Sequence, residues 1–234
     1  NIGENLGSLE GTGNVQLGTA SISPGQNNAS TFFSGVISGS GGLFKNGTGT
    51  MTLSGSNTYS GITTVTSGVL AVNGIQPQSA VSIGASGTLQ GIGTVGDILC
   101  SGNLSPGAGT GRLTCSNLTL AASGNFIVEL NGPPASGNFD QLRILGTNNL
   151  GSAALHVTTG FVADPGIGDT FTIMDDVPAS PITGTFLGLP DESTFTAGGY
   201  TFRVDYGGGT GNDVVLTVWG VPGESVTVNA TDRG

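Results

Sequence analysis

Charged side chains are scarce in this sequence: only 9% of its 234 residues are Asp, Glu, Lys or Arg. Five residues are Lys or Arg and 15 are Asp or Glu, so the formal net charge is −10. This balance excludes nucleic acid and anionic membrane surfaces as partners, because both require basic patches. The acidic excess permits weak binding of divalent cations, but a solvated surface that keeps the protein soluble is the simpler interpretation.

Long apolar runs are missing as well. No stretch approaches the roughly 18 apolar residues of a membrane-spanning helix, so we expect no membrane insertion of this segment. The first residues, Asn1-Ile2-Gly3-Glu4, show neither the basic start nor the apolar run of a signal peptide. Low charge with abundant Ser, Thr, Asn and Gly is typical of secreted β proteins. We therefore expect an exported, extracellular or cell-surface chain whose signal peptide has already been removed.

Residues that carry catalysis or bind metals are few. His156 is the one histidine, and its position between Leu155 and Val157 predicts an outward-facing side chain on a strand. A catalytic role would require a nucleophile and an orienting acid beside it. Two cysteines without a nearby histidine fall short of a tetrahedral metal site. We expect no enzyme activity, no cofactor and no metal site.

Paired carboxylates are the remaining candidates for chemistry, because two acids can cleave a glycosidic bond. Asp175 and Asp176 are adjacent in an expected turn, and Asp205 and Asp213 flank the glycine-rich loop 207–211. Aspartate is also a common turn former, and we interpret these residues in that way. A polysaccharide-active enzyme that uses Asp205 or Asp213 stays as a third hypothesis.

Glycine, in contrast, is abundant, with 44 residues, and it separates short runs in which apolar and polar residues alternate. The stretch 39–73 shows the pattern best: Thr50-Met51-Thr52-Leu53 and Thr63-Thr64-Val65-Thr66 alternate between Gly, Ser and Asn turns. Alternation with a period of two predicts β-strands with one buried face. The sequence therefore predicts an all-β fold with no helix longer than one turn.

A short motif recurs along the chain. Ser-Gly-x-Leu begins at Ser67, Ser86 and Ser101, so its steps are 19 and 15 residues. Steps of this size fit single turns of a β-solenoid made of two or three short strands. The unequal steps indicate a degenerate repeat.

The two cysteines, Cys100 and Cys115, are 15 residues apart, which equals the last repeat step. Neighbouring strands of a parallel ladder lie about 4.8 Å apart, and disulfides need Cα atoms roughly 4.4–6.8 Å apart. We therefore predict a disulfide between successive turns. The alternative is a pair of buried thiols that face the core.

The last third of the sequence is richer in proline and phenylalanine. Asp169–Met174 is predicted to be a strand that enters the Asp175-Asp176 turn, and Thr201–Tyr206 and Asp213–Trp219 are predicted to pair antiparallel. We expect wide final turns, decorated by hairpins, that close a solenoid domain over residues 1–220.

Residues 221–234 are expected to form a separate C-terminal tail. It contains one predicted strand, formed by Ser225, Val226, Thr227, Val228, Asn229 and Ala230. An unpaired strand of this kind can add to the sheet of a neighbouring subunit. We therefore expect this segment to take part in assembly.

The segment 39–61, with its Gly-Thr-Met-Thr-Leu-Ser-Gly-Ser-Asn-Thr-Tyr core, resembles the autotransporter-associated β-strand repeat of bacterial surface proteins. The stretches beginning at Leu104 and Gly111 resemble a turn of that family, and those beginning at Asp140, Gly168 and Gly211 resemble the closing turns that follow such repeats. The resemblance implies a single-stranded right-handed parallel β-helix that is exported. It implies a scaffold and not an enzyme, because one fold of this kind carries many functions.

These observations lead to a structural function. We expect an extracellular β-solenoid building block of a cell-surface layer, matrix or filament. The sequence starts as if within a repeat and shows no cap, so we expect more solenoid upstream or self-association end to end. The alternative is an autotransporter-type adhesin whose partners are glycans or host-cell surfaces.

Overall fold

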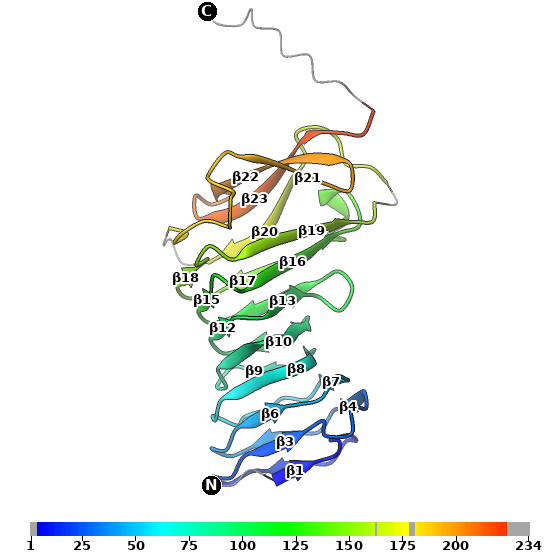
Figure 1. Cartoon of the computed structure of the whole chain (residues 1–234), viewed down its shortest axis with the longest axis vertical. Helices are drawn as coiled ribbons and strands as arrows, with labels where there is room; N and C mark the ends of the chain where they lie inside the picture. Colours follow the sequence, from blue (N-terminus) through cyan, green and yellow to red (C-terminus); the bar gives the residue numbers. More distant parts are fainter. Residues whose placement is uncertain (1–3, 162, 178–180, 224–234) are drawn as a thin grey trace, which may run out of the picture.

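The computed structural model describes residues 4–161, 163–177 and 181–223. Parallel strands stack along one axis into an elongated solenoid, with the described N-terminal strands at one end and an antiparallel cap at the other (Figure 1). Within the described residues the single helical element is one 3-10 turn, η1 (Pro134–Ser136). No helix in this part of the chain is long and apolar enough to cross a membrane. The prediction of an all-β solenoid is confirmed.

The strands form three faces, and each turn of the chain visits the faces in the same order. The first face consists of β1 (Glu4–Leu6), β3 (Ile22–Pro24), β6 (Leu43–Lys45), the start of β8 (Thr63–Val72), the start of β10 (Val81–Gly91), β12 (Ile98–Cys100), β15 (Leu118–Leu120) and β18 (Asn148–Asn149). The second face consists of β4 (Thr31–Phe33), β7 (Thr50–Leu53), the ends of β8 and β10, β13 (Asn103–Pro106), β16 (Asn125–Leu130) and β19 (Ala154–Thr159).

The third face begins with β2 (Val15–Gln16) and β5 (Ile37–Ser38), which pair with each other. It continues with β9 (Ile75–Gln76), β11 (Thr94–Val95), β14 (Arg112–Cys115), β17 (Gln141–Ile144) and β20 (Thr170–Asp176). The cap strands β23 (Asp213–Gly220), β22 (Tyr200–Gly208) and β21 (Thr194–Ala197) extend this face in antiparallel order.

The Ser-Gly-x-Leu motif marks the register of the second face. Ser67 lies beside Ser86 and Leu70 beside Leu89 in the β8–β10 ladder, and Leu89 lies beside Leu104 in the next ladder. The predicted repeat is therefore one turn of the solenoid. The 15-residue step holds on the second face alone, since Val81 pairs with Ile98 on the first face, 17 residues on.

The core follows from the alternation in the strands. Leu70, Leu89, Leu104 and Phe126 stack on one another, and each is fully buried. The residues on either side of them in the strands are mostly half-buried, and most are Ser, Thr, Asn or Gln. Each buried Leu or Phe side chain contributes about 1.5–3 kcal/mol, so a turn needs few inward side chains. This explains how a chain that is 36% hydrophobic by composition folds.

Lys45, in the segment 39–61, stabilises the backbone of the solenoid. Its side chain is buried, and its Nζ donates hydrogen bonds to the carbonyl oxygens of Asn46 (2.7 Å), Gly47 (3.0 Å) and Ser67 (3.2 Å). Burial lowers the pKa of this ammonium group. The lysine thus satisfies carbonyl groups at the bend between the first and second faces.

Tyr59 and Asn57 likewise supply hydrogen-bond partners to buried groups, at the bend between the third and the first faces. The hydroxyl of buried Tyr59 lies 2.6 Å from the hydroxyl of Thr63, which lies 2.7 Å from that of Ser79. The Asn57 side chain accepts a hydrogen bond from the amide of Ile37 (2.9 Å). Buried polar groups need such partners, so the Asn-Thr-Tyr motif is explained by the fold alone.

Glycines form a column at the bend between the second and third faces. A Cβ atom added at Gly55 would lie 2.0 Å from the carbonyl oxygen of Gly35, and one added at Gly74 would lie 2.1 Å from that of Gly55. The glycines in this column are Gly13, Gly35, Gly55, Gly74 and Gly93. Because backbones of successive turns pack directly on each other here, no side chain fits at Gly35, Gly55, Gly74 or Gly93, whereas a Cβ atom on Gly13 would meet nothing within 4 Å.

The predicted disulfide between successive turns is wrong. Cys100 in β12 has Ile83 and Leu120 as ladder neighbours, whereas Cys115 in β14 pairs with Ile144. Both cysteines are buried free thiols on different faces of one turn. The first-face step after Ile98 is 20 residues, so a spacing of 15 does not join stacked positions. Burial raises the pKa of Cys100 to about 11 and that of Cys115 to about 12.

The cap confirms the predicted hairpin, because β22 and β23 pair antiparallel around the glycine-rich loop. The predicted turn at Asp175-Asp176 is wrong, since both residues belong to β20. They continue the strand because Asp175 and Asp176 pair with Arg143 and Ile144 of β17. The domain boundary at 220/221 stays a prediction, and the predicted tail strand Ser225–Ala230 lies outside the described residues.

Candidate functional surface

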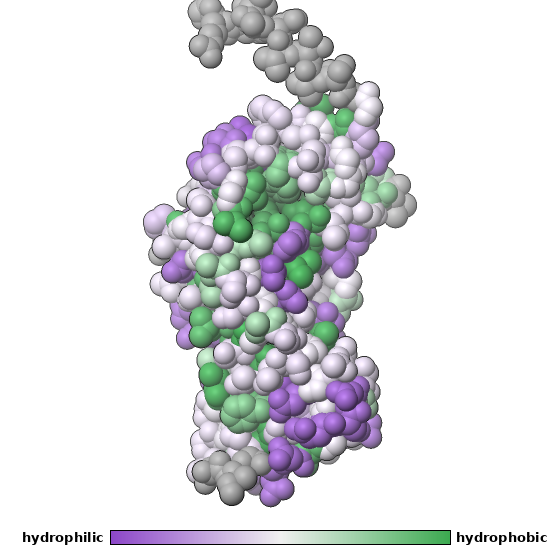
Figure 2. Space-filling model, viewed as in Figure 1, coloured by the Kyte–Doolittle hydropathy of each residue, from purple (hydrophilic) through white to green (hydrophobic). Residues whose placement is uncertain are grey.

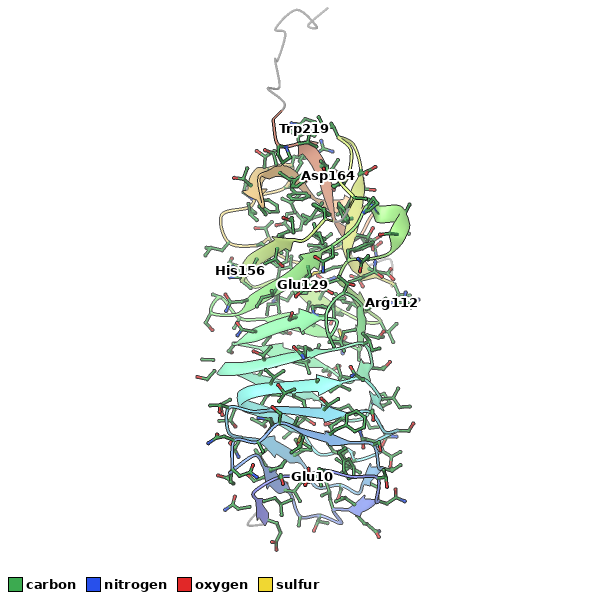
Figure 3. The ribbon with its side chains drawn as sticks, turned by 90° about the vertical axis from the view of Figure 1, so that its right-hand side faces the viewer. Glu10, Arg112, Glu129, His156, Asp164 and Trp219 are labelled. Carbon is green, nitrogen blue, oxygen red and sulfur yellow. The ribbon has the colours of Figure 1, made fainter. Side chains whose placement is uncertain are left out.

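A polar ladder crosses the outer side of the second face. The Asn125 side chain donates to the side-chain oxygen of Asn103 (3.0 Å), and the Nε2 atom of His156 lies 3.0 Å from the side-chain oxygen of Asn125. His156 is exposed on β19, as its alternation predicts. Figure 3 shows His156 and Glu129 on the wall of the solenoid, well away from Asp164 near the cap. The contact that the structure shows for His156 is with an amide.

The neighbouring carboxylates Asp175 and Asp176 point to opposite sides of β20. Asp175 lies 3.7 Å from the Nε atom of Arg143 near the surface. Asp176 is buried, accepts a hydrogen bond from the side chain of Asn148, and has its pKa raised by burial. The Oδ1 atom of Asp176 has no hydrogen-bond partner among the described residues. Side chains on opposite faces of a strand cannot act together on one bond.

Asp205 and Asp213 also differ in environment. Asp213 is buried, and its two oxygens accept hydrogen bonds from the amides of Asp176 (2.9 Å) and Thr210 (3.0 Å). Asp205 is half-buried, and its Oδ1 atom accepts a hydrogen bond from the amide of Gly207 (2.7 Å). Both carboxylates therefore hold the glycine-rich loop, which agrees with the turn-forming interpretation.

Asp205 belongs to one acidic cluster, with Asp191 and Glu192, in which carboxylate oxygens lie within 4.8 Å of one another. Each carboxylate in this cluster already has a partner. Asp191 accepts from the amide of Tyr206 (3.1 Å), and Glu192 pairs with Arg203 at 2.6 Å. Exposed carboxylates with these partners are sufficient to order the loop before β21.

Asp140 is a buried carboxylate whose role the sequence does not reveal. Its Oδ1 atom accepts from the amide of Gly111 (3.0 Å), and its Oδ2 atom accepts from that of Glu129 (2.9 Å). Burial, opposed by these hydrogen bonds, raises its pKa to about 7. Asp140 joins two loops to β16, so the aspartate that precedes β17 is a structural clamp.

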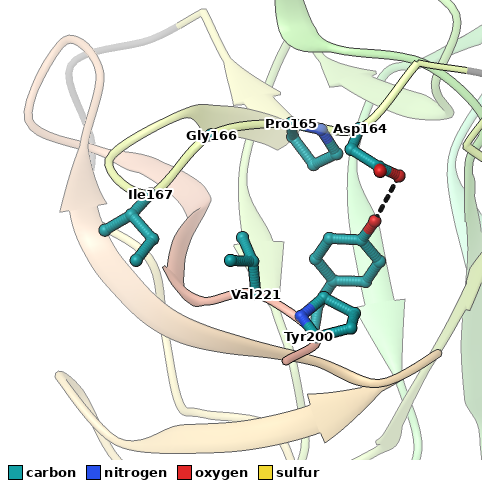
Figure 4. Close-up of a pocket in the computed structure, with 7 residues that line it drawn as sticks. Asp164, Pro165, Gly166, Ile167, Tyr200 and Val221 are labelled. Carbon is teal, nitrogen blue, oxygen red and sulfur yellow. Dashed lines mark hydrogen bonds between the residues drawn. The ribbon is translucent and has the colours of Figure 1, made fainter. Parts of the chain in front are cut away.

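A surface cavity of about 330 Å³ lies beside the cap and is lined by Asp164, Pro165, Gly166, Ile167, Tyr200, Val221 and Pro222. Figure 4 shows the Tyr200 hydroxyl directed at Asp164, a hydrogen bond of 2.5 Å. This bond, with burial, raises the pKa of Tyr200 to about 12. No sequence motif indicates this pair, because Asp164 and Tyr200 are 36 residues apart.

Comparison with known proteins identifies the repeat. Residues 43–72, which comprise β6, β7 and β8, match the family described as passenger-associated-transport-repeat. The chain is 38% identical over 103 residues to an adhesin autotransporter, BmaC, of Brucella suis biovar 1 (strain 1330). The match covers 42% of this chain and 3% of the adhesin.

Two proteins of Serratia marcescens, each named extracellular serine protease, are also similar. One is 52% identical over 83 residues, which cover 35% of this chain and 8% of the protease. The other is 53% identical over 64 residues, which cover 27% of this chain and 6% of the protease. The chain thus spans a small part of each relative, and the activities in these names are those of the relatives.

The repeat match lies on the turns that Lys45, Asn57 and Tyr59 hold together. Strand order, register and family model therefore agree on the same segment. The chain carries the passenger-associated-transport-repeat of autotransporters within an all-β solenoid.

Proposed function

We propose that the chain is a structural solenoid segment of a bacterial protein that is exported to the cell surface or beyond. The observation that carries this proposal is the first face, where eight strands from β1 to β18 stack in one uninterrupted parallel ladder. Such a ladder is stiff along its axis, and each turn contacts only its neighbours. The names of the relatives, autotransporter and extracellular protease, support the location.

The proposed role is to build a surface layer, matrix or filament by self-association. Among the described residues β1 pairs with β3 alone, and Leu6 and Leu9 are only partly buried against the core. The other edge of β1 is the proposed contact for a further strand. A second copy of the chain is the proposed partner.

Electron microscopy of the native material and sedimentation velocity of the purified chain test this role. We expect rods of uniform width and a sedimentation coefficient that rises with concentration. Leu6→Glu is expected to reduce the association, and Glu10→Leu serves as a control at an exposed site in the same turn. Monomers at every concentration, with no layer or filament in the native material, would contradict self-assembly.

An adhesin is the second candidate, because the Brucella relative is named as one. The ladder of half-buried Asn103 and Asn125 with exposed His156 offers amide and imidazole groups of the kind that bind sugar hydroxyls. A glycan array and a cell-binding assay test this candidate. Saturable binding that Asn125→Ala weakens would support it, whereas no binding to any glycan or cell would remove it.

We infer that the segment is not itself an enzyme. The partners of Asp205, Asp213 and His156 described above are turn amides and an asparagine, and these arrangements explain the residues without chemistry. A fluorophosphonate probe, which labels activated serines, and an assay of polysaccharide cleavage both test this inference. Labelling of the chain, or cleavage that Asp205→Asn or Asp213→Asn abolishes, would contradict it.

A further inference from the structure

The last strand of the second face, β19, has one free edge. It pairs with β16 over its whole length, from Ala154 beside Asn125 to Thr159 beside Leu130. Within the described residues no strand pairs with its other edge. The nearest strand on that side, β21, pairs with β22 alone among the described strands. β19 therefore offers an open row of backbone groups to another strand.

The direction of these groups follows from the hydrogen bonds to β16. The amides of Ala154 and Gly160 donate to the carbonyl oxygens of Gly124 (3.0 Å) and Leu130 (2.9 Å). Because successive amides alternate in direction along a strand, the amides of Leu155 and Val157 face the free edge. They are donors without a strand partner in the described part of the chain.

Apolar side chains lie beside this edge. Leu155 and Val157 of β19 and Phe195 and Ala197 of β21 pack against the core but are only partly buried. Leu187, whose amide donates to the carbonyl oxygen of Ala153 (2.9 Å), is 65% exposed. Figure 2 shows a hydrophobic, hollowed area in the upper part of this face, below the cap. The free edge and the apolar surface together form the β19 groove.

The described chain ends close to this groove. A Cβ atom on Gly198 would meet the Thr159 side chain, at the end of β19, and a Cβ atom on Gly199 would lie 3.4 Å from Pro222. Gly223 is the last described residue. Two extended residues span at most roughly 7 Å, so a strand that begins at Ser225 can reach the end of β19.

We propose that the segment Ser225–Ala230 of the same chain docks in the β19 groove as an antiparallel strand. The segment has six residues, as β19 does, and its apolar residues alternate: Val226, Val228 and Ala230. These side chains cover Leu155 and Val157, and the segment's carbonyl groups accept hydrogen bonds from the free amides. A chain that enters at the end of β19 runs back along it, which sets the antiparallel direction.

Amide hydrogen exchange of the full-length chain, followed by NMR, tests the proposal. We expect slow exchange at Leu155 and Val157 and, in Val228→Asp, an increase of at least about tenfold at both amides. Thr227→Asp adds the same charge on the solvent side of the segment and is expected to leave both amides protected. The Val128 amide, which faces β19 from β16, reports that the fold is intact in each variant.

Fast exchange at Leu155 and Val157 in the unaltered chain would overturn the proposal. Protection that Val228→Asp leaves unchanged would overturn it as well. Protection that disappears on dilution, together with a dimer in light scattering, would show that a second copy supplies the strand and would overturn docking within one chain. Self-association through β1, which the proposed function requires, is measured separately and can fail or hold independently.

Discussion

The stacked turns and the cap bury their cores by different means. In the turns, identical positions lie on one another, so leucine stacks on leucine and glycine on glycine. At the cap, phenylalanine rings from segments far apart in the sequence pack edge to face: Phe171 contacts Phe139 at 5.4 Å and Phe202 at 6.4 Å between ring centroids. Both ion pairs between described residues also involve β20, β22 or the loop before β21.

This difference reflects two geometric tasks. A repeating turn needs side chains that are complementary to themselves, and Leu, Asn, Ser and Gly meet that condition. A cap must end the ladder, so it needs large side chains that cover the last turn. Aromatic residues bury much area in defined geometry, which explains why phenylalanine is concentrated at the C-terminal end.

The largest expected effect is the loss of a core ring in the cap. Phe171 is fully buried, and Phe171→Ala is expected to destabilise the protein by about 3–5 kcal/mol. The single tryptophan, Trp219, lies in β23 and reports on the cap, while far-UV circular dichroism reports on all turns. We expect urea to unfold the cap of Phe171→Ala before the turns.

The matched variant in the turns is Leu70→Ala, which removes a buried side chain from β8 and is expected to cost about 2–5 kcal/mol. If cap and turns are separate units, this variant shifts the circular dichroism transition more than the tryptophan transition. Coincident transitions in both variants would show that the two regions unfold as one.

Removal of the buried ammonium group tests the turns alone. Lys45→Met leaves carbonyl groups at the bend without their donor, so we expect a loss of about 1–3 kcal/mol. Arg112→Met, at an exposed position, is the control and is expected to change little. If Lys45→Met and the control are equally stable, water replaces the ammonium group with no loss of folding free energy.

Asp140, which joins a loop to β16, makes the free energy of unfolding depend on pH. Its pKa is raised to about 7 in the fold, from an ordinary value of 3.8. A raised carboxyl pKa favours the protonated form in the fold, so this stabilisation is complete below about pH 4 and is lost as pH rises through about 7. The urea concentration at the midpoint of unfolding should therefore fall between pH 4 and pH 8, because Asp140 loses its proton in this range.

In Asp140→Asn we expect this part of the slope to disappear. Stability at low pH should also fall by about 1 kcal/mol, because an amide can accept only one of the two backbone hydrogen bonds. Asp97→Asn is an exposed control, which should keep the slope of the unaltered protein. The same slope in both variants would assign the pH dependence to other groups.

The smallest expected effect concerns the surface of the cap. Arg203 pairs with Glu192 at 2.6 Å and lies 4.7 Å from the ring centre of Trp219. Exposed contacts of this kind contribute about 1 kcal/mol or less. Arg203→Ala should change the emission of Trp219 while leaving the urea midpoint nearly constant, and a large shift of the midpoint would show that this contact holds the cap.

Much of the fold is predictable from local patterns. Alternating residues define the strands, the Ser-Gly-x-Leu motif defines the register of the second face, and the hairpin at 207–212 follows from its glycines. These features are local or repeat once per turn, so they leave a trace in the sequence. The mistaken disulfide arose because turn lengths differ between faces of the same solenoid.

The buried and paired carboxylates are less predictable from the sequence, because their contacts join segments that are far apart in the chain. Asp164 meets Tyr200, and Asp140 meets Gly111, across 36 and 29 residues. Asp176 alternates into the core only because β20 continues past Met174 to pair with β17. Such contacts depend on where loops and cap strands lie, and no repeat period encodes that position.

The glycine column has a consequence for how such chains change in length. Since each bend rests on the bend below, a whole turn can be inserted or deleted without altering the faces, whereas a partial insertion must leave the column as a loop. The step from Leu118 to Asn148, 30 residues instead of 20, shows this outcome, because the extra residues lie in the loop around η1. Added residues are therefore accommodated in a loop at a bend, while the ladders on either side keep their register.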